Sequence, residues 1–258
     1  MRLMKRILSA AAVLALSASL LVGCSSGTAS SVPVSASSAA ESTVSSVEET
    51  ASSAVDENEA AAAQLLNDLT GSYQELWPVI LADEYKQTWL DDCTALVGEE
   101  NAEAAFEKLS SMVTSDVYGE DAVEAYANGG GAYFCGFTNS LATLTFDGET
   151  STISGTDKDG NALFSHTYHY IGMEPVHGLY EFESDDADSG EFTYFFLAPD
   201  TSAETYHIEF RYGSDAEALS QYDAGEYAYW VASGISTDCD QTMIDNCIEL
   251  FCTENLAG

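Results

Sequence analysis

Four histidines, six cysteines and 43 aspartates and glutamates are the side chains of this 258-residue sequence that could hold a metal or take part in catalysis. Imidazole nitrogen, thiolate sulfur and carboxylate oxygen are the ligands that zinc takes from proteins. His166 and His169 lie three residues apart in a segment rich in Tyr, Phe and Thr, so on a strand they point to opposite faces and cannot share one site. His177 lies in a Pro-Val-His-Gly turn, and His207 follows much later.

Patterns typical of known enzyme sites are missing from the sequence. It contains no GxSxG, no HExxH and no phosphate-binding loop, and no nucleophile stands at a recognisable spacing from a base. Asp157–Asn161 has the acidic spacing of a calcium loop, but the twelfth position is Tyr168, where such a loop requires a bidentate Glu. We therefore expect a hairpin turn there, and a binding protein rather than an enzyme.

The first 23 residues have the pattern of an export signal. Arg2, Lys5 and Arg6 precede an apolar run from Ile7 to Leu21, which is shorter than the roughly 20 residues that span a bilayer as a helix. The run ends in Leu-Val-Gly-Cys24, which resembles the lipobox of bacterial lipoproteins, where cleavage precedes a cysteine that then carries a lipid. An ordinary signal peptide with a chance cysteine is the alternative.

A linker and a single domain are expected after Cys24. Residues 24–60 are rich in Ser and Ala and contain no aromatic residue, so they cannot bury enough apolar surface to fold and should act as a disordered tether. Residues 61–258 then form one domain. We expect the protein at the bacterial cell surface, held to the membrane only by the lipid on Cys24.

Charge restricts the possible partners. The formal net charge is −36, with 7 Lys and Arg against 43 Asp and Glu. Such a surface repels phosphate backbones and anionic headgroups, which argues against nucleic-acid binding and electrostatic membrane docking. Cations are the natural partners, although solubility alone also favours acidic surfaces.

Five cysteines remain once Cys24 is assigned to the anchor, and because five is odd at least one stays free. There is no CxxC, which argues against a structural zinc site made of cysteines. Export permits disulfides, but the pairing stays open. The five are Cys93, Cys135, Cys239, Cys247 and Cys252.

Hydrophobic periodicity predicts an α+β fold. Residues 60–128 have the three- and four-residue spacing of helices, with breaks at Gly71, Pro78 and Gly98. From residue 132 to 213, short β-rich runs alternate with Asp, Ser, Gly and Pro clusters, which is typical of an antiparallel meander closed into a barrel or folded as a sandwich. Ala216–Tyr222 and Thr242–Cys252 are again predicted helices.

Four segments, in the same order, resemble the ZinT (YodA) family of zinc-binding proteins. The similarity covers about residues 65–255 and consists of a Leu, Gly, aromatic and Gln pattern leading to a Pro-containing helix, a hairpin, a strand ending in Ala-Pro, and a His-x-Glu step before Gly-Ser-Asp. These segments are Leu69–Pro78, Tyr168–Phe182, Phe192–Pro199 and His207–Asp215.

The resemblance implies a lipocalin-like (calycin) barrel with flanking N- and C-terminal helices, and zinc held at one barrel mouth by three histidines. His207 matches the first histidine of the family's His-x-His pair, and Glu209 matches the second. On a strand, residues two apart share a face, so both would look into one lumen. The third family position is Phe195, which cannot bind a metal, and His177 is the best-placed substitute.

The function implied by the resemblance is an extracytoplasmic, lipid-anchored protein that binds zinc for scavenging or buffering. Its partners would be the divalent metal ion and a metal-uptake transporter. The alternative keeps the barrel without the metal, and its aromatic lumen then binds a small apolar or carbohydrate-like ligand.

Overall fold

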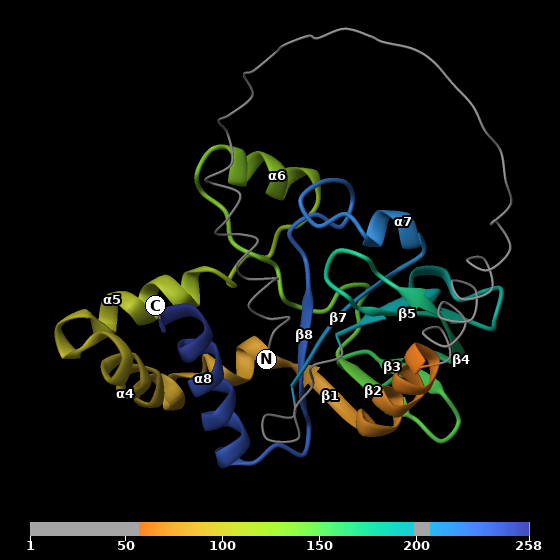
Figure 1. Ribbon diagram of the computed structural model, residues 1–258, viewed down its shortest axis with the longest axis horizontal. Coiled ribbons are helices and arrows are strands. Elements are labelled where there is room, and N and C mark those ends of the chain that lie inside the picture. The colour runs from red at the N-terminus through yellow and green to blue at the C-terminus, as the bar shows by residue number, and fades with distance from the viewer. Residues whose placement is uncertain (1–56, 199–206, 258) are drawn as a thin grey trace, which may run out of the picture.

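The structure, a computed structural model, describes residues 57–198 and 207–257. The export signal, Cys24 and most of the expected tether lie outside these residues. The predicted α+β architecture is confirmed, because the chain forms a closed antiparallel β-barrel with helices beside it (Figure 1). Within the described residues, no helix has both the length and the apolar character that a bilayer crossing requires.

The barrel is a meander of eight strands in which each strand pairs with the next along the chain, and β8 closes the sheet on β1. Every pairing is antiparallel, which is the order of an up-and-down barrel. The strands are β1 (Gly71–Glu75), β2 (Thr143–Asp147), β3 (Thr152–Thr156), β4 (Ala162–Met173), β5 (Tyr180–Ser184), β6 (Tyr194–Leu197), β7 (His207–Gly213) and β8 (Ala232–Ser236).

Alternation of side chains places aromatic rings in the lumen. In the register of β5, β6 and β7, Phe182 stands opposite Phe195, and Phe195 stands opposite Tyr212. The ring of Phe195 lies 5.4 Å from that of Tyr168 and 6.0 Å from that of Phe164, both on β4. Because these rings meet from different strands, the face that carries them is the interior of the barrel. The interior is a packed core.

One end of the barrel is closed by the segment that leads into β2. The ring of Phe137 lies 5.4 Å from that of Phe210 on β7. The backbone N–H of Phe137 donates to the Glu75 carboxylate at 2.6 Å, and that of Thr138 donates to the Tyr212 hydroxyl at 2.6 Å. These hydrogen bonds hold the segment to β1 and to β7, which lie on either side of β8.

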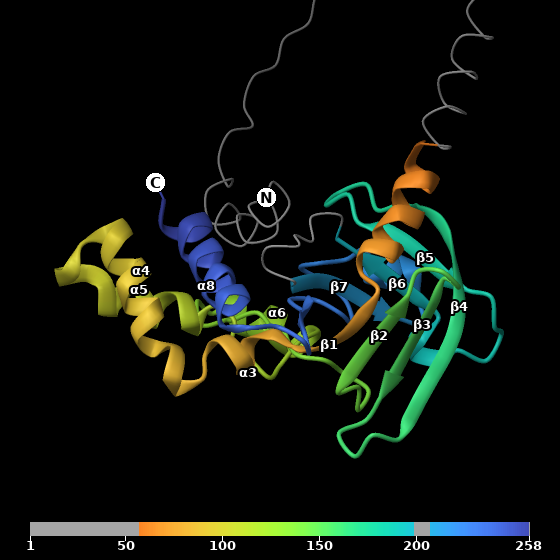
Figure 2. The same cartoon turned by 90° about the horizontal axis from the view of Figure 1, so that it is seen from below.

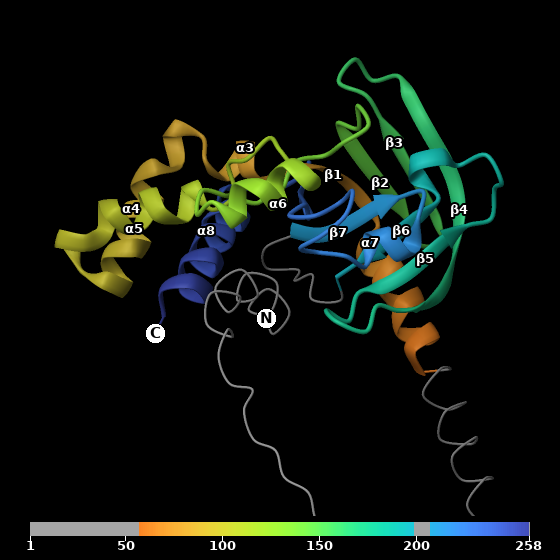
Figure 3. The same cartoon turned by 90° about the horizontal axis from the view of Figure 1, so that it is seen from above.

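A second layer of helices packs against one side of the barrel (Figures 2 and 3). At its centre Trp89 is fully buried, its indole N–H donates to the carbonyl of Ile80 at 2.7 Å, and its ring lies 5.8 Å from that of Phe251. The helical elements are α3 (Leu76–Ile80), η1 (Asp83–Tyr85), α4 (Lys86–Val97), α5 (Glu99–Ser111), α6 (Glu120–Ala127), η2 (Gly190–Phe192), α7 (Ala216–Leu219) and α8 (Gln241–Leu256).

Two strands differ from the sequence prediction. The helical pattern across residues 65–81 in fact contains β1 between the helical residues 57–68 and α3. The helix ends before β1 and packs close to the β2–β3 turn, where a Cβ on Gly148 would collide with the backbone of Asn67. The second difference is β8, which the sequence analysis did not predict.

Candidate functional site

Strand β7 carries the predicted ligands, and its two faces have different surroundings. Ile208, Phe210 and Tyr212 form its lumen face, since Phe210 and Tyr212 lie 6.3 Å and 5.4 Å, ring to ring, from Phe195. His207 and Glu209 therefore point the other way, together with Arg211. We call this the outer face of β7. It is buried all along, because other parts of the chain cover it.

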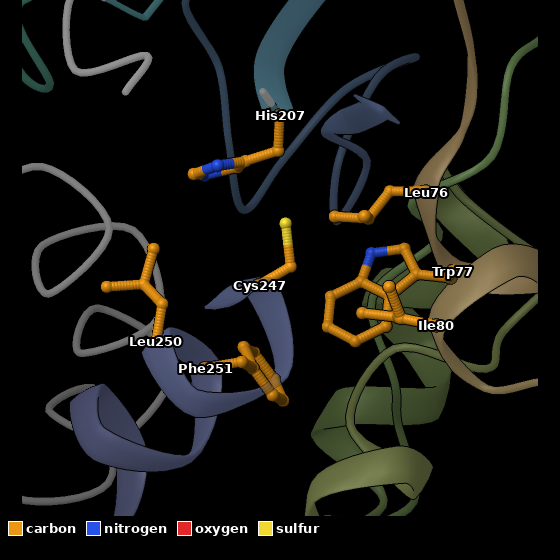
Figure 4. Close-up of a pocket in the computed structure, with 7 residues that line it drawn as sticks. All are labelled: Leu76, Trp77, Ile80, His207, Cys247, Leu250 and Phe251. Carbon is orange, nitrogen blue, oxygen red and sulfur yellow. The ribbon is translucent and has the colours of Figure 1, made fainter. Parts of the chain in front are cut away.

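His207 faces the helical layer. It lines a small pocket of about 10 Å³ between β7, α3 and α8, which is room for about one water molecule. Figure 4 shows the thiol of Cys247, on α8, pointing into this pocket below the imidazole. Both side chains are buried, His207 at 5% exposure and Cys247 at 4%. The other lining residues are apolar or aromatic: Leu76, Trp77, Ile80, Leu250 and Phe251.

Glu209 lies one step further along the outer face, opposite Ser233 of β8. The side chain is 8% exposed. Burial and the negative charge of Glu209 both raise the pKa of the neighbouring Cys135 thiol above its usual range. Cys135 is therefore a neutral thiol in this environment. The Glu209 carboxylate beside it places negative charge on the buried outer face of β7.

Arg211 completes the outer face and is fully buried. Its guanidinium donates to the backbone carbonyls of Leu219, Gln221 and Tyr227, which fastens the segment after α7 to the barrel wall. The guanidinium carbon also lies 4.2 Å from the centre of the Tyr222 ring. A planar cation with several donors suits such a site, because one side chain serves several carbonyls and a ring.

His177 contacts Tyr222, the ring that also lies beside Arg211, and it does not line the His207 pocket. Its ring lies 3.7 Å from that of Tyr222, and its Nδ1 lies 3.5 Å from the carboxylate of Glu174. Glu174 is fully buried and accepts the backbone N–H of His177 at 2.6 Å and that of Val176 at 2.9 Å. Burial raises the pKa of Glu174, but these hydrogen bonds and His177 outweigh it and hold that pKa below its ordinary value.

The structure does not bring the three predicted ligands together. Among residues 57–198 and 207–257, no group of three His, Cys, Asp or Glu side chains could hold a metal ion. His207 and Glu209 do share a face, as their spacing predicts. That face is not the lumen, so the expectation that both look into the barrel is wrong.

The same geometry explains why Phe195 does not mark a lost ligand of the His207 pocket. Phe195 is in the lumen, fully buried among rings. The residue next to Glu209 on this side is instead Ala198, directly after β6, whose N–H donates to the Glu209 carbonyl at 2.9 Å. A third donor from this side would have to stand at position 198 or beyond, and residues 199–206 lie outside the described structure.

His166 and His169 serve separate aspartates. The Nδ1 atom of His166 lies 2.8 Å from Asp186, and that of His169 lies 2.8 Å from Asp185. His166 also stacks on Phe164, with 5.8 Å between the ring centres, whereas the His169 side chain is 52% exposed. The two do not form one site, as their spacing predicts.

A larger pocket of about 300 Å³ opens between α3 and the segments 113–115 and 134–136. Glu75 contributes to its wall beside Trp77, Phe134 and Cys135. The sequence does not predict this pocket, because its residues come from three distant segments. Nor does the sequence predict Cys247 as a neighbour of His207, although three cysteines cluster in the last twenty residues.

Comparison with known proteins gives no sequence match, because neither a family model nor a curated protein matches the chain. Solved structures are similar, among them two in which zinc is bound. The Zn(II)-bound ZinT-like domain of Streptococcus pneumoniae AdcA has a TM-score of 0.44 and 15% identity, over 70% of this chain and 87% of that domain. Zn(II)-bound AdcA from Streptococcus pneumoniae has a TM-score of 0.41 and 13% identity, over 71% of this chain but 34% of that one.

The first of these two structures is described as a ZinT-like domain. In both solved structures zinc is bound.

Proposed function

We propose that this chain is a zinc-binding protein, displayed outside the cytoplasm by a lipid on Cys24, with His207 as its principal ligand. The observation that carries the proposal is that His207 and Cys247 line the same small pocket between β7, α3 and α8, with the Cys247 thiol pointing into it. Cys247 replaces His177, which we expected from the sequence as the substitute third ligand. Glu209 lies one step further along the same buried face and adds negative charge near the pocket.

The donor types fit zinc better than they fit calcium or magnesium. Imidazole nitrogen and thiolate sulfur are ligands of zinc and of similar transition metals, whereas calcium and magnesium take oxygen. The pocket holds about 10 Å³, so one ion or one water is the largest occupant it accepts without movement. Its apolar walls contain no competing cation.

Two protein donors are fewer than a closed structural zinc site uses. Structural sites take four protein ligands, while sites that keep an open position exchange what they hold. An incomplete set suits a scavenger or buffer, which must release zinc again, and it assigns no catalytic role. The formal charge of −36 supports this role, because it concentrates divalent cations around the protein without selecting among them.

Zinc titration of the purified chain against a chelating dye tests the proposal. One equivalent should bind, and His207→Ala or Cys247→Ser should each abolish or strongly weaken that binding. The matched control is His169→Ala, which removes an exposed imidazole paired with Asp185 and should leave binding unchanged. Weak uptake of several equivalents that salt removes and that none of the variants changes would contradict the proposal and indicate only an acidic surface.

A second candidate function is binding of a small organic ligand in the 300 Å³ pocket beside α3. Its volume and its aromatic walls are typical of ligand sites, and the Glu75 carboxylate favours a ligand with a cationic or hydrogen-bond-donating group. The lumen, which the sequence predicted as the cavity in this case, is filled by aromatic side chains instead.

A thermal-shift screen with small aromatic amines tests this second candidate. A hit should lose its effect in Glu75→Gln, where the amide oxygen still accepts the N–H of Phe137 but the charge is gone. A hit that stabilises both forms equally binds elsewhere.

A further inference from the structure

Two of the five described cysteines meet between the helices of the second layer. Cys93 on α4 and Cys252 on α8 are separated by 159 positions in the chain, and their Sγ atoms lie 3.9 Å apart. Both are fully buried. The ring of Trp89, one turn before Cys93, packs on the ring of Phe251, next to Cys252, with 5.8 Å between their centres. The two sulfurs are therefore held facing each other by the aromatic packing around them.

This separation is close to the reach of a covalent bond. A disulfide places its sulfurs about 2.05 Å apart, and the side chains can close much of the remaining gap by rotation about χ1. The pairing leaves Cys135, Cys239 and Cys247, and we expect these three to stay thiols.

We propose that Cys93 and Cys252 form a disulfide after export and staple α8, the C-terminal helix, to α4. The oxidant is a disulfide of a small thiol or of an oxidoreductase. One cysteine thiolate attacks it and displaces a thiol, and the second thiolate then attacks the mixed disulfide. The two cysteines lose two protons and two electrons, and the oxidant is reduced to two thiols.

Burial determines when the bond forms. Burial raises the pKa of Cys93 and of Cys252 above the ordinary thiol value, and neither side chain is exposed, so both are unreactive in the finished fold. Oxidation must occur while α8 is undocked, during folding outside the cytoplasm, where disulfides persist. Once formed, the bond is protected from reductants by the same packing.

The staple has a consequence for the pocket at His207. Helix α8 also carries Cys247, Leu250 and Phe251, which line that pocket, so fixing α8 on α4 fixes one wall of it. This consequence rests on the proposed zinc function, whereas the bond itself does not.

Peptide mapping under non-reducing conditions tests the bond. The purified chain is unfolded, refolded in a buffer of reduced and oxidised glutathione, and cleaved after glutamate. Cys93 then lies in residues 85–99, Cys252 in 250–254, and Cys239 with Cys247 in 227–249. We expect 85–99 linked to 250–254, with the mass of two hydrogens lost. All five thiols remaining free, or 227–249 linked to either peptide, would overturn the proposal.

Stability and zinc binding give two further readouts. The refolded chain should melt on the order of 10 °C above the Cys93→Ser/Cys252→Ser variant under the same oxidising conditions, because the bond closes a very long loop. Cys239→Ser is the matched control and should keep the bond and the melting temperature. Equal melting temperatures for the double variant and the parent chain would show that α8 is not stapled.

Zinc titration of the parent chain and the double variant then separates the two proposals. Weaker binding in the double variant supports the link between staple and pocket. Equal binding with the disulfide mapped refutes that link and leaves the bond standing, whereas absence of zinc binding in both refutes the zinc site alone.

Discussion

The guanidinium of Arg211 lies over the ring of Tyr222, with 4.2 Å between its central carbon and the ring centre. The other neighbour of this ring is His177, at 3.7 Å between ring centres, and His177 contacts the buried Glu174. A cation, two rings and an anion thus form a continuous stack outside the barrel wall. The stack fastens the loop after β4 and the segment after α7 to β7, and no metal is needed to explain it.

Arg211→Lys should lower the free energy of unfolding by about 3 kcal/mol, because a buried ammonium cannot serve three carbonyls and a ring as the guanidinium does. Urea unfolding followed by circular dichroism measures it. Lys158→Gln, at an exposed turn, is the control and should change stability by less than about 0.5 kcal/mol. A loss in Arg211→Lys no larger than in the control would show that the stack contributes little.

Glu174→Gln should destabilise the fold at neutral pH and have little effect in acid. Hydrogen bonds hold the pKa of Glu174 below its ordinary value of 4.5, so the carboxylate stabilises the fold above that value. The stabilisation is lost as the pH falls through the depressed pKa of the folded state. Comparing melting temperatures of parent and variant between pH 7 and pH 3 measures it. A difference that stays constant over this range would mean that the charge is unimportant.

The sequence predicted strands β2 to β7 because each shows β-rich composition bounded by turn residues. It missed β8, whose Ala-Ser-Gly-Ile-Ser lacks the large side chains that mark a strand. Glycine suits position 234 of β8 for a physical reason, because a Cβ there would press on Ile208 in the lumen. The strand β1 was hidden because Tyr73 happens to continue the helical spacing of its neighbours.

The orientation of the predicted ligands could not be read from the sequence. A spacing of two correctly placed His207 and Glu209 on one face. All seven residues of β7 are buried, however, so alternation between apolar and polar residues does not reveal which face is the lumen. The lumen was assigned by the family pattern, and only the contacts of Phe210 and Tyr212 correct it.

Phe195→His and Ala198→His should therefore behave differently towards zinc. Phe195→His restores the family's residue but places it in the lumen, so zinc affinity should not rise, and stability should fall by about 2 kcal/mol because a polar ring replaces a packed one. Ala198→His adds an imidazole on the outer face beside Glu209 and should raise zinc affinity by about tenfold or more.

Titration of both variants in parallel, with circular dichroism to check folding, measures the difference. The reverse order, with Phe195→His the tighter binder, would place the metal inside the barrel and contradict the outer-face site.

Zinc binding should release a proton from Cys247. Burial raises the pKa of this thiol to about 12, so at neutral pH it is protonated, and zinc binds the thiolate. Affinity should therefore rise by about tenfold for each pH unit on account of Cys247. Calorimetry at pH 7.5 in buffers of different ionisation enthalpy should count about one proton released per zinc. In Cys247→Ser, any remaining zinc binding should release none, because a serine hydroxyl stays protonated. Equal proton release in the variant and the parent chain would remove Cys247 from the site and leave His207 without its proposed partner.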